Sequence, residues 1–434
     1  MRVRPTPLLA TVLTLLPIAS TTAQVSLRDL PEMARARAER LRPKQVAALE
    51  PFWADLSLDY ANNQEFLDRR IADAAHLGDS VVPLLLEKLQ PAQNTDTALN
   101  LAGNCRRVLQ RLDPGSFVDA LAELTRGSHA VARSEAIRLL GYAEVPQAVA
   151  VLVDMLDKTK WEDRYRVLQS LRRLKARSAA PKVVPLLGGS ERRLREDVLA
   201  FLVAAKADQV APTVVQALST ETDDRLLSGY IDYFAVCVRR NESAALALLP
   251  LLERDRIDWQ DTLSLVKALA YVAPRRHEPT MRKLHEMIDG NDTSSIAVYS
   301  AVSLRELGDK NGVTRMKRAL DDKLRRRKRE ASLYEQRASL LFAIGEFGDA
   351  TDDYEKILEY ADGAAMTRRA YQGLLKSEAR RRKIQNVVKH MKASGMSPEE
   401  FERLARYDEP FREAMKHDRV QSYMRQLRKS RAPK

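Results

Sequence analysis

The sequence predicts an all-α protein in which helical hairpins stack side by side to form an α-solenoid. One apolar pattern recurs every 31 residues, and within each period the apolar residues follow the i, i+3 or i+4, i+7 spacing of an amphipathic helix. The composition agrees, because 45% of the 434 residues are hydrophobic, 30% are charged and only 16 are glycine. A chain of this length can bury an extensive core, either in two or three compact domains or in one long array.

The repeat is clearest in residues 105–214, where five apolar positions recur in four consecutive units without an insertion. The five sets are Cys105, Ala136, Val167, Val198; Leu109, Leu140, Leu171, Leu202; Leu112, Ala143, Leu174, Ala205; Val118, Val149, Ala180, Ala211; and Leu121, Leu152, Val183, Val214. Each unit contains the amphipathic stripe twice, with a short polar break between the two copies. Such a hairpin cannot bury its apolar face alone, so its neighbours must cover this face by stacking.

Local signals place helix starts within the repeats. Pro146 is expected at the start of a second helix, where its missing N–H is not needed, and Ser178 is expected to cap another. The array continues with looser spacing on both sides, and the segments that carry the pattern are 77–89, 227–253, 262–288 and 301–320. We therefore expect an N-terminal helical capping segment at 24–61 and the solenoid at 62–322.

The segment 301–320 reads AVSLRELGDKNGVTRMKRAL. Its Leu-x-x-Leu-Gly-Asp motif, followed by Val313 and Met316, resembles the HEAT-like repeat. The period of about 31 residues resembles the short form of this repeat that occurs in phycobilin-lyase-type proteins. The resemblance covers about residues 62–322 and implies an armadillo-like helical array. It implies little about activity, because the motif residues are core and turn positions.

The pattern changes from about residue 331. The segment 340–362, LLFAIGEFGDATDDYEKILEYAD, is similar to a tetratricopeptide repeat, whose glycine, aromatic, alanine and aromatic positions are matched by Gly345, Phe347, Ala350 and Tyr354. Residues 364–398 read as a degenerate second unit with Val387 at the alanine position, and residues 407–424 resemble the capping helix of such arrays. The resemblance implies a tetratricopeptide-like helical region at 331–434 and a groove for a short peptide.

The first 23 residues have the three parts of a secretory signal peptide. Arg2 and Arg4 form a basic region, residues 8–19 are apolar, and Thr21-Thr22-Ala23 places small residues before a cut at Gln24. The alternative interpretation is a buried N-terminal helix. No cysteine follows the apolar region and no later segment has roughly 18 uncharged apolar residues, so we expect neither a lipoprotein anchor nor a transmembrane segment. The mature protein is expected to be exported, to the periplasm or outside the cell.

No constellation typical of catalysis, metal binding or a bound cofactor occurs in the sequence. The six histidines form no His-x-x-x-His pair, and His277 and His285 are interpreted as exposed residues on separate helices rather than as a metal site. Cys105 and Cys237 are interpreted as core thiols, and about four repeats at roughly 10 Å each separate them, too far for a disulfide. We therefore expect a protein that is not an enzyme and needs no cofactor or metal.

The positive charge is concentrated in the last quarter of the chain. Residues 323–434 contain 27 Lys and Arg against 17 Asp and Glu, whereas residues 24–322 contain 43 against 42. The clusters are KLRRRKR (323–329), within an expected basic linker at 323–330, RRRK (380–383), and the tail 425–434. They form either a solvated linker surface or an electrostatic surface for an acidic protein, an anionic lipid or a glycan. Nucleic acid ranks last, because few aromatic residues are interleaved with the basic ones.

Eight residues are candidates for contacting a partner. Trp161 and Trp259 stand in Trp-Glu-Asp and Trp-Gln-Asp at the expected starts of first helices. Each is either a partner anchor or a residue that packs its hairpin onto the next one. The basic candidates are Arg325, Arg326, Arg327, Arg380, Arg381 and Arg382.

The sequence thus predicts an exported, non-enzymatic scaffold that binds another macromolecule, with a protein as the expected partner. A solenoid offers a long preformed surface that loses little conformational entropy on binding. Two alternatives stay open: a helical-repeat enzyme, such as a lyase-like protein acting on a small ligand, and a structural component of the cell envelope.

Overall fold

A computed structural model describes residues 43–158, 161–254, 257–289 and 293–431. All the regular elements within these ranges are helices, which confirms the all-α solenoid predicted from the repeat. The chain divides into two compact units, Met1–Ala217 and Leu218–Lys434. The expected signal peptide (1–23) and the first part of the expected capping segment lie outside the described residues.

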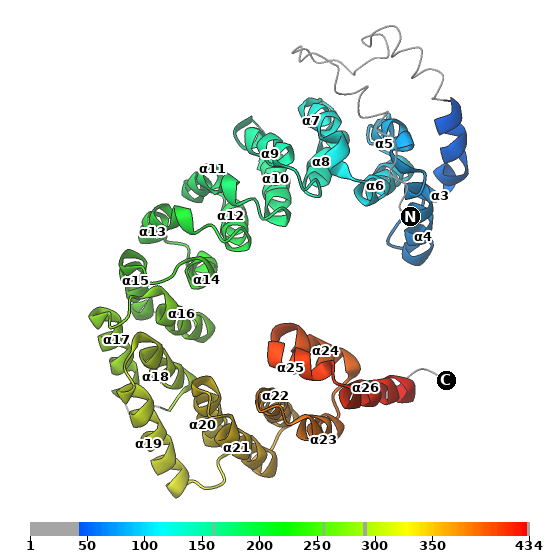
Figure 1. Cartoon of the computed structure of the whole chain (residues 1–434). Helices are drawn as coiled ribbons and strands as arrows, with labels where there is room; N and C mark the ends of the chain where they lie inside the picture. Colours follow the sequence, from blue (N-terminus) through cyan, green and yellow to red (C-terminus); the bar gives the residue numbers. More distant parts are fainter. Residues whose placement is uncertain (1–42, 159–160, 255–256, 290–292, 432–434) are drawn as a thin grey trace. The chain divides into compact units, whose positions relative to one another are not determined.

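The first unit consists of helices in two rows (Figure 1). It begins with η2 (Glu50–Phe52), α3 (Trp53–Leu56), α4 (Gln64–Ala75), η3 (Gly78–Val81) and α5 (Val82–Lys88). The inner row then comprises α6 (Asp96–Arg111), α8 (Ala130–Leu140), α10 (Trp161–Arg173) and α12 (Arg192–Ala204). The outer row comprises η4 (Pro114–Phe117), α7 (Val118–Arg126), α9 (Pro146–Lys158), η5 (Arg177–Ala179), α11 (Ala180–Val183), η6 (Val184–Gly188), η7 (Asp208–Val210) and α13 (Ala211–Ser219). Consecutive inner helices pack on each other, and α7, α9 and η6 pack on the inner helices that follow them.

The core lies between the two rows and is built from the predicted template. Three of the five predicted sets, those that begin with Cys105, Leu109 and Leu121, are buried in all four repeats. The prediction for Pro146 is confirmed, because α9 begins there. The prediction that Ser178 caps a helix was wrong. This residue lies inside the 3-10 turn η5, and α11 follows from Ala180 without a side-chain cap.

The second unit continues the alternation of helices. Its elements are η8 (Asp224–Leu226), α14 (Leu227–Cys237), α15 (Glu242–Leu248), η9 (Leu249–Glu253), α16 (Trp259–Val272), α17 (Glu278–Asp289), α18 (Ser295–Leu307), α19 (Asn311–Arg326), α20 (Ala331–Ile344), α21 (Phe347–Tyr360), α22 (Ala364–Arg380), α23 (Ile384–Ser394), α24 (Pro398–Tyr407), α25 (Glu409–Met415) and α26 (Asp418–Arg431). Residues 323–326 of the expected linker belong to α19, and a turn at 327–330 leads into α20. Because α20 packs on both α18 and α19, the helices before and after this turn share one packed array.

Several helices are followed within a few residues by a residue with left-handed backbone. Five such residues are Lys175, Lys206, Arg240, Arg276 and Arg382, whose φ lies between 49° and 58°. Gly308 and Gly345 hold the equivalent places after α18 and α20, with φ of 104° and 89°. Side chains other than glycine disfavour this conformation, so long cationic side chains here indicate a compensating interaction.

Arg240 shows how hydrogen bonds compensate for the left-handed backbone. Its backbone N–H donates to the carbonyl of Tyr271 at 3.0 Å, and its Nη1 donates to the carbonyls of Ala270 and Ala273 at 3.0 and 2.9 Å. These carbonyls belong to the C-terminal end of α16, where a cation is also favoured by the helix dipole. The turn after α14 is thereby bonded to the end of the next helix in the row, which fixes the spacing between repeats.

The last helices pack around close helix contacts. The ring of Tyr354 in α21 lies so close to the backbone of Gly373 in α22 that a Cβ on this glycine would stand 2.3 Å from the Tyr354 Cζ. Beyond α22, the buried side chains of Met391, Phe401 and Phe411 join α23, α24 and α25 in one apolar cluster.

Candidate interaction surfaces

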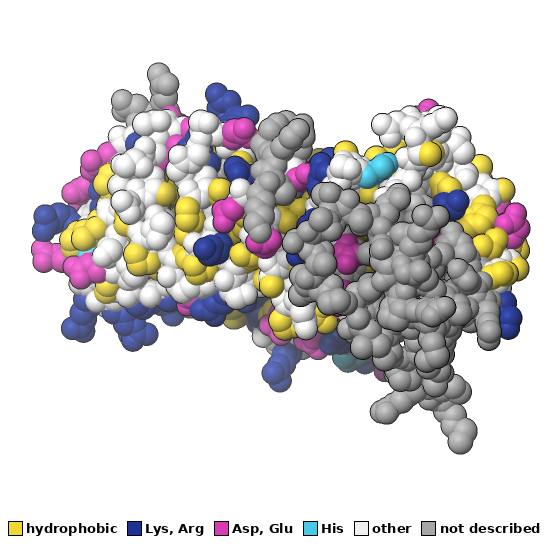
Figure 2. Space-filling view, turned by 90° about the horizontal axis from the view of Figure 1, so that it is seen from above, with side chains coloured by type: hydrophobic (Ala, Val, Ile, Leu, Met, Phe, Trp, Pro, Cys, Tyr) yellow, Lys and Arg dark blue, Asp and Glu magenta, His cyan; other side chains and the backbone are white. Residues whose placement is uncertain are grey.

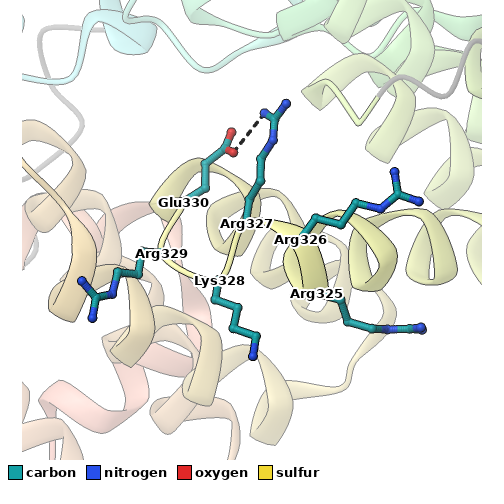
Figure 3. Close-up of a pocket in the computed structure, with 6 residues that line it drawn as sticks. All are labelled: Arg325, Arg326, Arg327, Lys328, Arg329 and Glu330. Atoms are coloured by element: carbon teal, nitrogen blue, oxygen red, sulfur yellow. Dashed lines mark hydrogen bonds and ion pairs between the residues drawn. The ribbon is translucent and has the colours of Figure 1, made fainter.

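The basic cluster at the end of α19 forms a shallow, open hollow (Figure 3). It has a volume of about 590 Å³ and is lined by Arg325, Arg326, Arg327, Lys328, Arg329 and Glu330. The side chains fan out around the turn and do not converge on one point (Figure 3). Arg327 pairs with Glu330 at 3.2 Å, and Arg325 pairs with Asp322 at 3.0 Å. This arrangement offers a dispersed positive surface rather than a site for a single small anion.

The second cluster, at the end of α22, is built differently. Arg380 is mostly buried, pairs with Asp408 at 2.8 Å, and lies over the rings of Phe342 and Phe347 with its guanidinium carbon 4.6 and 5.7 Å from their centroids. Arg381 pairs with the buried Glu378 at 3.3 Å. Of the three arginines predicted here, only Arg382 lies exposed without an ion pair to the described residues. Arg380 therefore holds α22 against its neighbours.

The two clusters do not form one surface. The first lies where α19 ends and α20 begins, whereas the second lies where α22 ends and α23 begins. Helix α22, residues 364–380, lies between the two clusters along the chain. At 1.5 Å per residue its length separates their positions by about 25 Å. An extended partner or two separate contacts would be needed to engage both clusters.

Many of the carboxylates within residues 323–431 are ion-paired, whereas several basic side chains there are not. Ten carboxylates are ion-paired: Glu330, Glu335, Glu346, Asp353, Glu359, Glu378, Glu400, Glu402, Asp408 and Glu413. Within the described part of the chain, no ion pair holds Arg326, Lys328, Arg329, Lys383, Lys389 or Lys392. Lys389 and Lys392 line a second shallow hollow on α23, of about 540 Å³, with Gln385, Val388 and Ala393.

The two tryptophan candidates stand in equivalent places. Trp161 is the first residue of α10, but its side chain lies outside the described part of the structure. Trp259 is the first residue of α16, and 58% of its surface is exposed. Most of this ring is therefore available to a partner and does little to pack α16 onto its neighbours.

The prediction that His277 and His285 are exposed and lie on separate helices was wrong. His277 is buried, and its Nδ1 lies 2.8 Å from the Thr280 hydroxyl at the start of α17. His285 lies in α17 itself, with its Nε2 2.7 Å from the Asp309 carboxylate. Among the residues that the structure describes, no group of three His, Cys, Asp or Glu is placed to hold a metal ion. Neither cysteine forms a disulfide within the described residues; Cys105 is buried and Cys237 is partly buried.

The structure reveals a set of arginine–carboxylate contacts on the inner row of the first unit. Arg106 of α6 reaches Glu135 of α8 at 2.6 Å, an ion pair without the alignment of a hydrogen bond, and Arg138 also pairs with Glu135 at 3.0 Å. One step along, Arg133 of α8 donates from its Nε to Asp163 of α10 at 2.7 Å. Arg166 donates to the other oxygen of Asp163 at 3.2 Å. We call this set the arginine ladder; each of these two carboxylates is bound by one arginine from the preceding inner helix and one from its own helix.

The inner row has a further carboxylate at α12, Asp197, which is not part of the ladder. Its Oδ2 is buried and has no hydrogen-bond partner among the described residues. Burial raises the pKa of Asp197 to about 6, although the positive charges of Arg193 and Arg172 act in the opposite direction. Arg193 is held by the ring of Tyr165, 4.6 Å from its guanidinium carbon, and donates to the Tyr165 hydroxyl at 3.0 Å.

The sequence analysis missed the ladder because its near-neutral total for the solenoid conceals a difference between the two rows. Helices α6, α8, α10 and α12 contain twelve arginines and six acidic residues, whereas α7, α9, α11 and α13 contain three basic and four acidic residues. One signal was available, since Arg133, Arg164 and Arg195 recur at the period of 31. Of these three only Arg133 belongs to the ladder, so registering polar positions would have indicated an arginine-rich inner row but not its ion pairs.

Figure 2 shows the described side chains that are visible on one face of the molecule. Hydrophobic side chains are interspersed there with polar ones, and Lys and Arg side chains gather along its lower edge (Figure 2). Within the described ranges, the helices include none with the length and apolar character needed to cross a bilayer.

Comparison with known proteins agrees with the stacked hairpins. The model of the family described as HEAT repeats matches residues 118–202, which run from the first residue of α7 into α12. Among curated proteins, none matches the chain. The match and the succession of packed helices together support a HEAT-like repeat protein.

Proposed function

We propose that this chain is an exported, non-enzymatic scaffold that binds a protein partner on its helical array. The observation that carries the proposal is the two-row helical architecture with its match to HEAT repeats, which are helical hairpins whose stacking creates long binding surfaces. Export rests on the signal-peptide pattern of residues 1–23 and places the mature chain in the periplasm or outside the cell.

The C-terminal basic surface is proposed to attract an acidic partner. Arg326, Lys328 and Arg329 at the α19–α20 turn are exposed and unpaired within the described residues, so their charges act on the solvent side. An acidic protein fits better than a small anion, because the side chains around this turn diverge (Figure 3). Charges of this kind raise association rates and give binding that weakens with salt. Anionic lipid and glycan remain the alternatives for this surface.

The last helices are proposed to work as a tetratricopeptide-like array. The contact between Tyr354 and Gly373 supports this, because it uses an aromatic side chain and a small residue at positions where neighbouring repeats pack. The left-handed Gly345 and Arg382 stand 37 residues apart at the two hairpin turns, which supports a second, degenerate repeat. The phycobilin-lyase-type resemblance favours the runner-up function, a lyase-like enzyme that acts on a small ligand.

The test is a pull-down from the envelope fraction of the native organism with residues 24–434 as bait, washed at low and high salt. The variant Lys328→Gln/Arg329→Gln removes two charges from the basic surface, and Arg126→Gln/Lys182→Gln removes two exposed charges from the outer row as a control. We expect one discrete protein partner, retained by the control, weakened by the first variant and eluted by salt.

The outcomes separate the candidate functions. A partner that both variants retain equally would place the contact on the near-neutral array and leave the basic turn with a solvation role. A partner retained in fixed stoichiometry at high salt would indicate a structural envelope component. Absence of any protein partner in every wash would overturn the scaffold proposal and favour a small ligand.

A further inference from the structure

The inner row of the first unit carries an excess of positive charge, although residues 24–322 as a whole are close to neutral. All twelve basic residues of α6, α8, α10 and α12 are arginines, and they outnumber the acidic residues of these helices by two to one. The core positions of these helices face the outer row, so the arginines lie on the side away from the core or between neighbouring inner helices. We infer that this row binds an extended acidic segment of a polypeptide that crosses α8, α10 and α12.

The guanidinium groups are held in place before any partner binds. Arg138 is anchored by Glu135 through one Nη1 bond while 48% of its side chain stays exposed. Arg173 lies over the ring of Tyr142 at 4.1 Å, and Arg193 over that of Tyr165 at 4.6 Å. A guanidinium has five N–H donors in a planar fork, so a single anchor leaves donors for a second carboxylate. Anchored side chains lose less conformational entropy on binding than free ones.

The spacing of the row fits an extended polypeptide. Neighbouring packed helices are about 8–10 Å apart, and an extended chain in the polyproline II conformation rises about 3.1 Å per residue with three residues per turn, so every third side chain lies on the same side. An acidic residue at every third position therefore meets one inner helix after another. Each step of the ladder carries a small positive excess, since two arginines face one carboxylate at Glu135 and again at Asp163. One partner carboxylate per step is enough to neutralise it.

The spacing of charge on the inner row, its carboxylates and its tyrosine rings disfavour a nucleic acid as the partner. Duplex DNA carries a negative charge about every 1.7 Å, several for each step of the row. The carboxylates of Glu135, Asp163 and Asp197 would remain in this surface and repel so dense an anion. A guanidinium group covers one face of each of the rings of Tyr142 and Tyr165, and both residues are partly buried, which leaves little ring face on which a base could stack.

This inference rests on the proposed scaffold function only in taking the partner to be a protein, and it uses a different surface from the C-terminal basic turn. The experiment measures binding of fluorescent peptides to residues 24–434 by anisotropy at low salt. One peptide is (Glu-Gly-Ser)₆; the second has the same composition with its six glutamates in one block; the third probe is a single-stranded oligouridine of equal charge.

The variant Arg138→Gln/Arg173→Gln/Arg193→Gln removes one exposed, anchored arginine from each of α8, α10 and α12. The matched control, Lys88→Gln/Arg126→Gln/Lys182→Gln, removes one exposed charge from each of α5, α7 and α11, outside the inner row and the C-terminal turn. We expect the spaced peptide to bind the parent several-fold more tightly than the blocked one. The inner-row variant should bind it at least tenfold more weakly, and the control should stay within twofold of the parent.

Equal losses in both variants, equal binding of the two peptides, or no peptide binding would overturn the inference. Tighter binding of the oligouridine would assign the row to nucleic acid instead. Circular dichroism checks the fold of each variant, and the Arg→Lys triple at the same positions separates lost charge from lost structure. Failure of the peptide experiment beside a successful pull-down would reject the inner row and leave the scaffold proposal standing.

Discussion

Asp163 of α10 accepts a hydrogen bond from Arg133 of α8 at 2.7 Å, and its own side chain is only 7% exposed. The bond joins two consecutive repeats, and Arg166 holds the second carboxylate oxygen. We expect Asp163→Ala to lower the free energy of unfolding by about 1–3 kcal/mol, because it leaves two partly buried guanidinium groups without their acceptor. Urea unfolding followed by circular dichroism measures this loss.

The control for that experiment is Glu65→Ala, which removes the partner of Arg69 in an ion pair that is almost fully exposed at 4.0 Å. Exposed pairs contribute little, so its effect should stay below about 0.5 kcal/mol. Similar losses for the two variants would mean that the ladder contributes no more than an ordinary surface pair.

Asp197 makes stability depend on pH. Its pKa is raised to about 6 by burial, so the folded state keeps the proton up to a higher pH than the unfolded chain does. Relative to a carboxyl with an ordinary pKa, Asp197 adds to the free energy of unfolding below about pH 4. This contribution is lost as the pH rises through 6. Asp197→Asn should therefore be more stable than the parent at pH 7, by up to about 1 kcal/mol after discounting for partial exposure, and equal to it at pH 4. Thermal unfolding at both pH values tests this, and a difference that does not vary with pH would contradict the assignment.

Gly373 should tolerate no side chain. Its missing Cβ makes room for the ring of Tyr354, three atoms of which lie 2.3–2.6 Å from where that Cβ would stand. We expect Gly373→Ala to destabilise the last helices by about 1–3 kcal/mol through overpacking. Gly348→Ala, at a helical position with only Arg381 Nη2 at 4.0 Å, should be neutral or stabilising. Limited proteolysis of the full chain, with the rate of cleavage followed within residues 331–431, compares the two variants.

Cys105 should be unreactive in the folded protein. It is completely buried, and burial raises the pKa of its thiol to about 12, so almost no thiolate exists at neutral pH. In a Cys237→Ser background, we expect a thiol reagent to label the chain only at the rate of unfolding and to label it at once in denaturant. Rapid labelling without denaturant would mean that the first unit opens locally around α6.

The repeat made the core predictable, because burial follows the apolar period alone. Leu140 and Leu171 needed only their spacing of 31 to be placed between the two rows, and both are fully buried. Ser178 failed because the local backbone decided the helix start. The chain forms a 3-10 turn there before α11 begins at Ala180, with Pro181 in its first turn, so the expected N-cap never forms.

The candidate surfaces were less predictable, because their contacts cross between helices. Arg133 and Asp163 are 30 residues apart, and nothing near either residue in the sequence indicates the other. Arg380 read as part of a basic run, yet its partners Asp408 and Phe342 come from α25's N-cap and α20. Charge runs give the total charge of a segment, but only packing decides which side chains reach solvent.

The strict period of 31 also governs how the length of this protein can change. Removing residues 144–174 would join Ala143 to Lys175 and leave every remaining core position aligned with its neighbours, because Ala143 and Leu174 occupy the same place in the template. Duplication of such a segment would extend the two rows in the same way. Recombination can therefore lengthen or shorten the array by whole repeats while the same core positions are kept. The length of the inner row then changes in steps of one repeat.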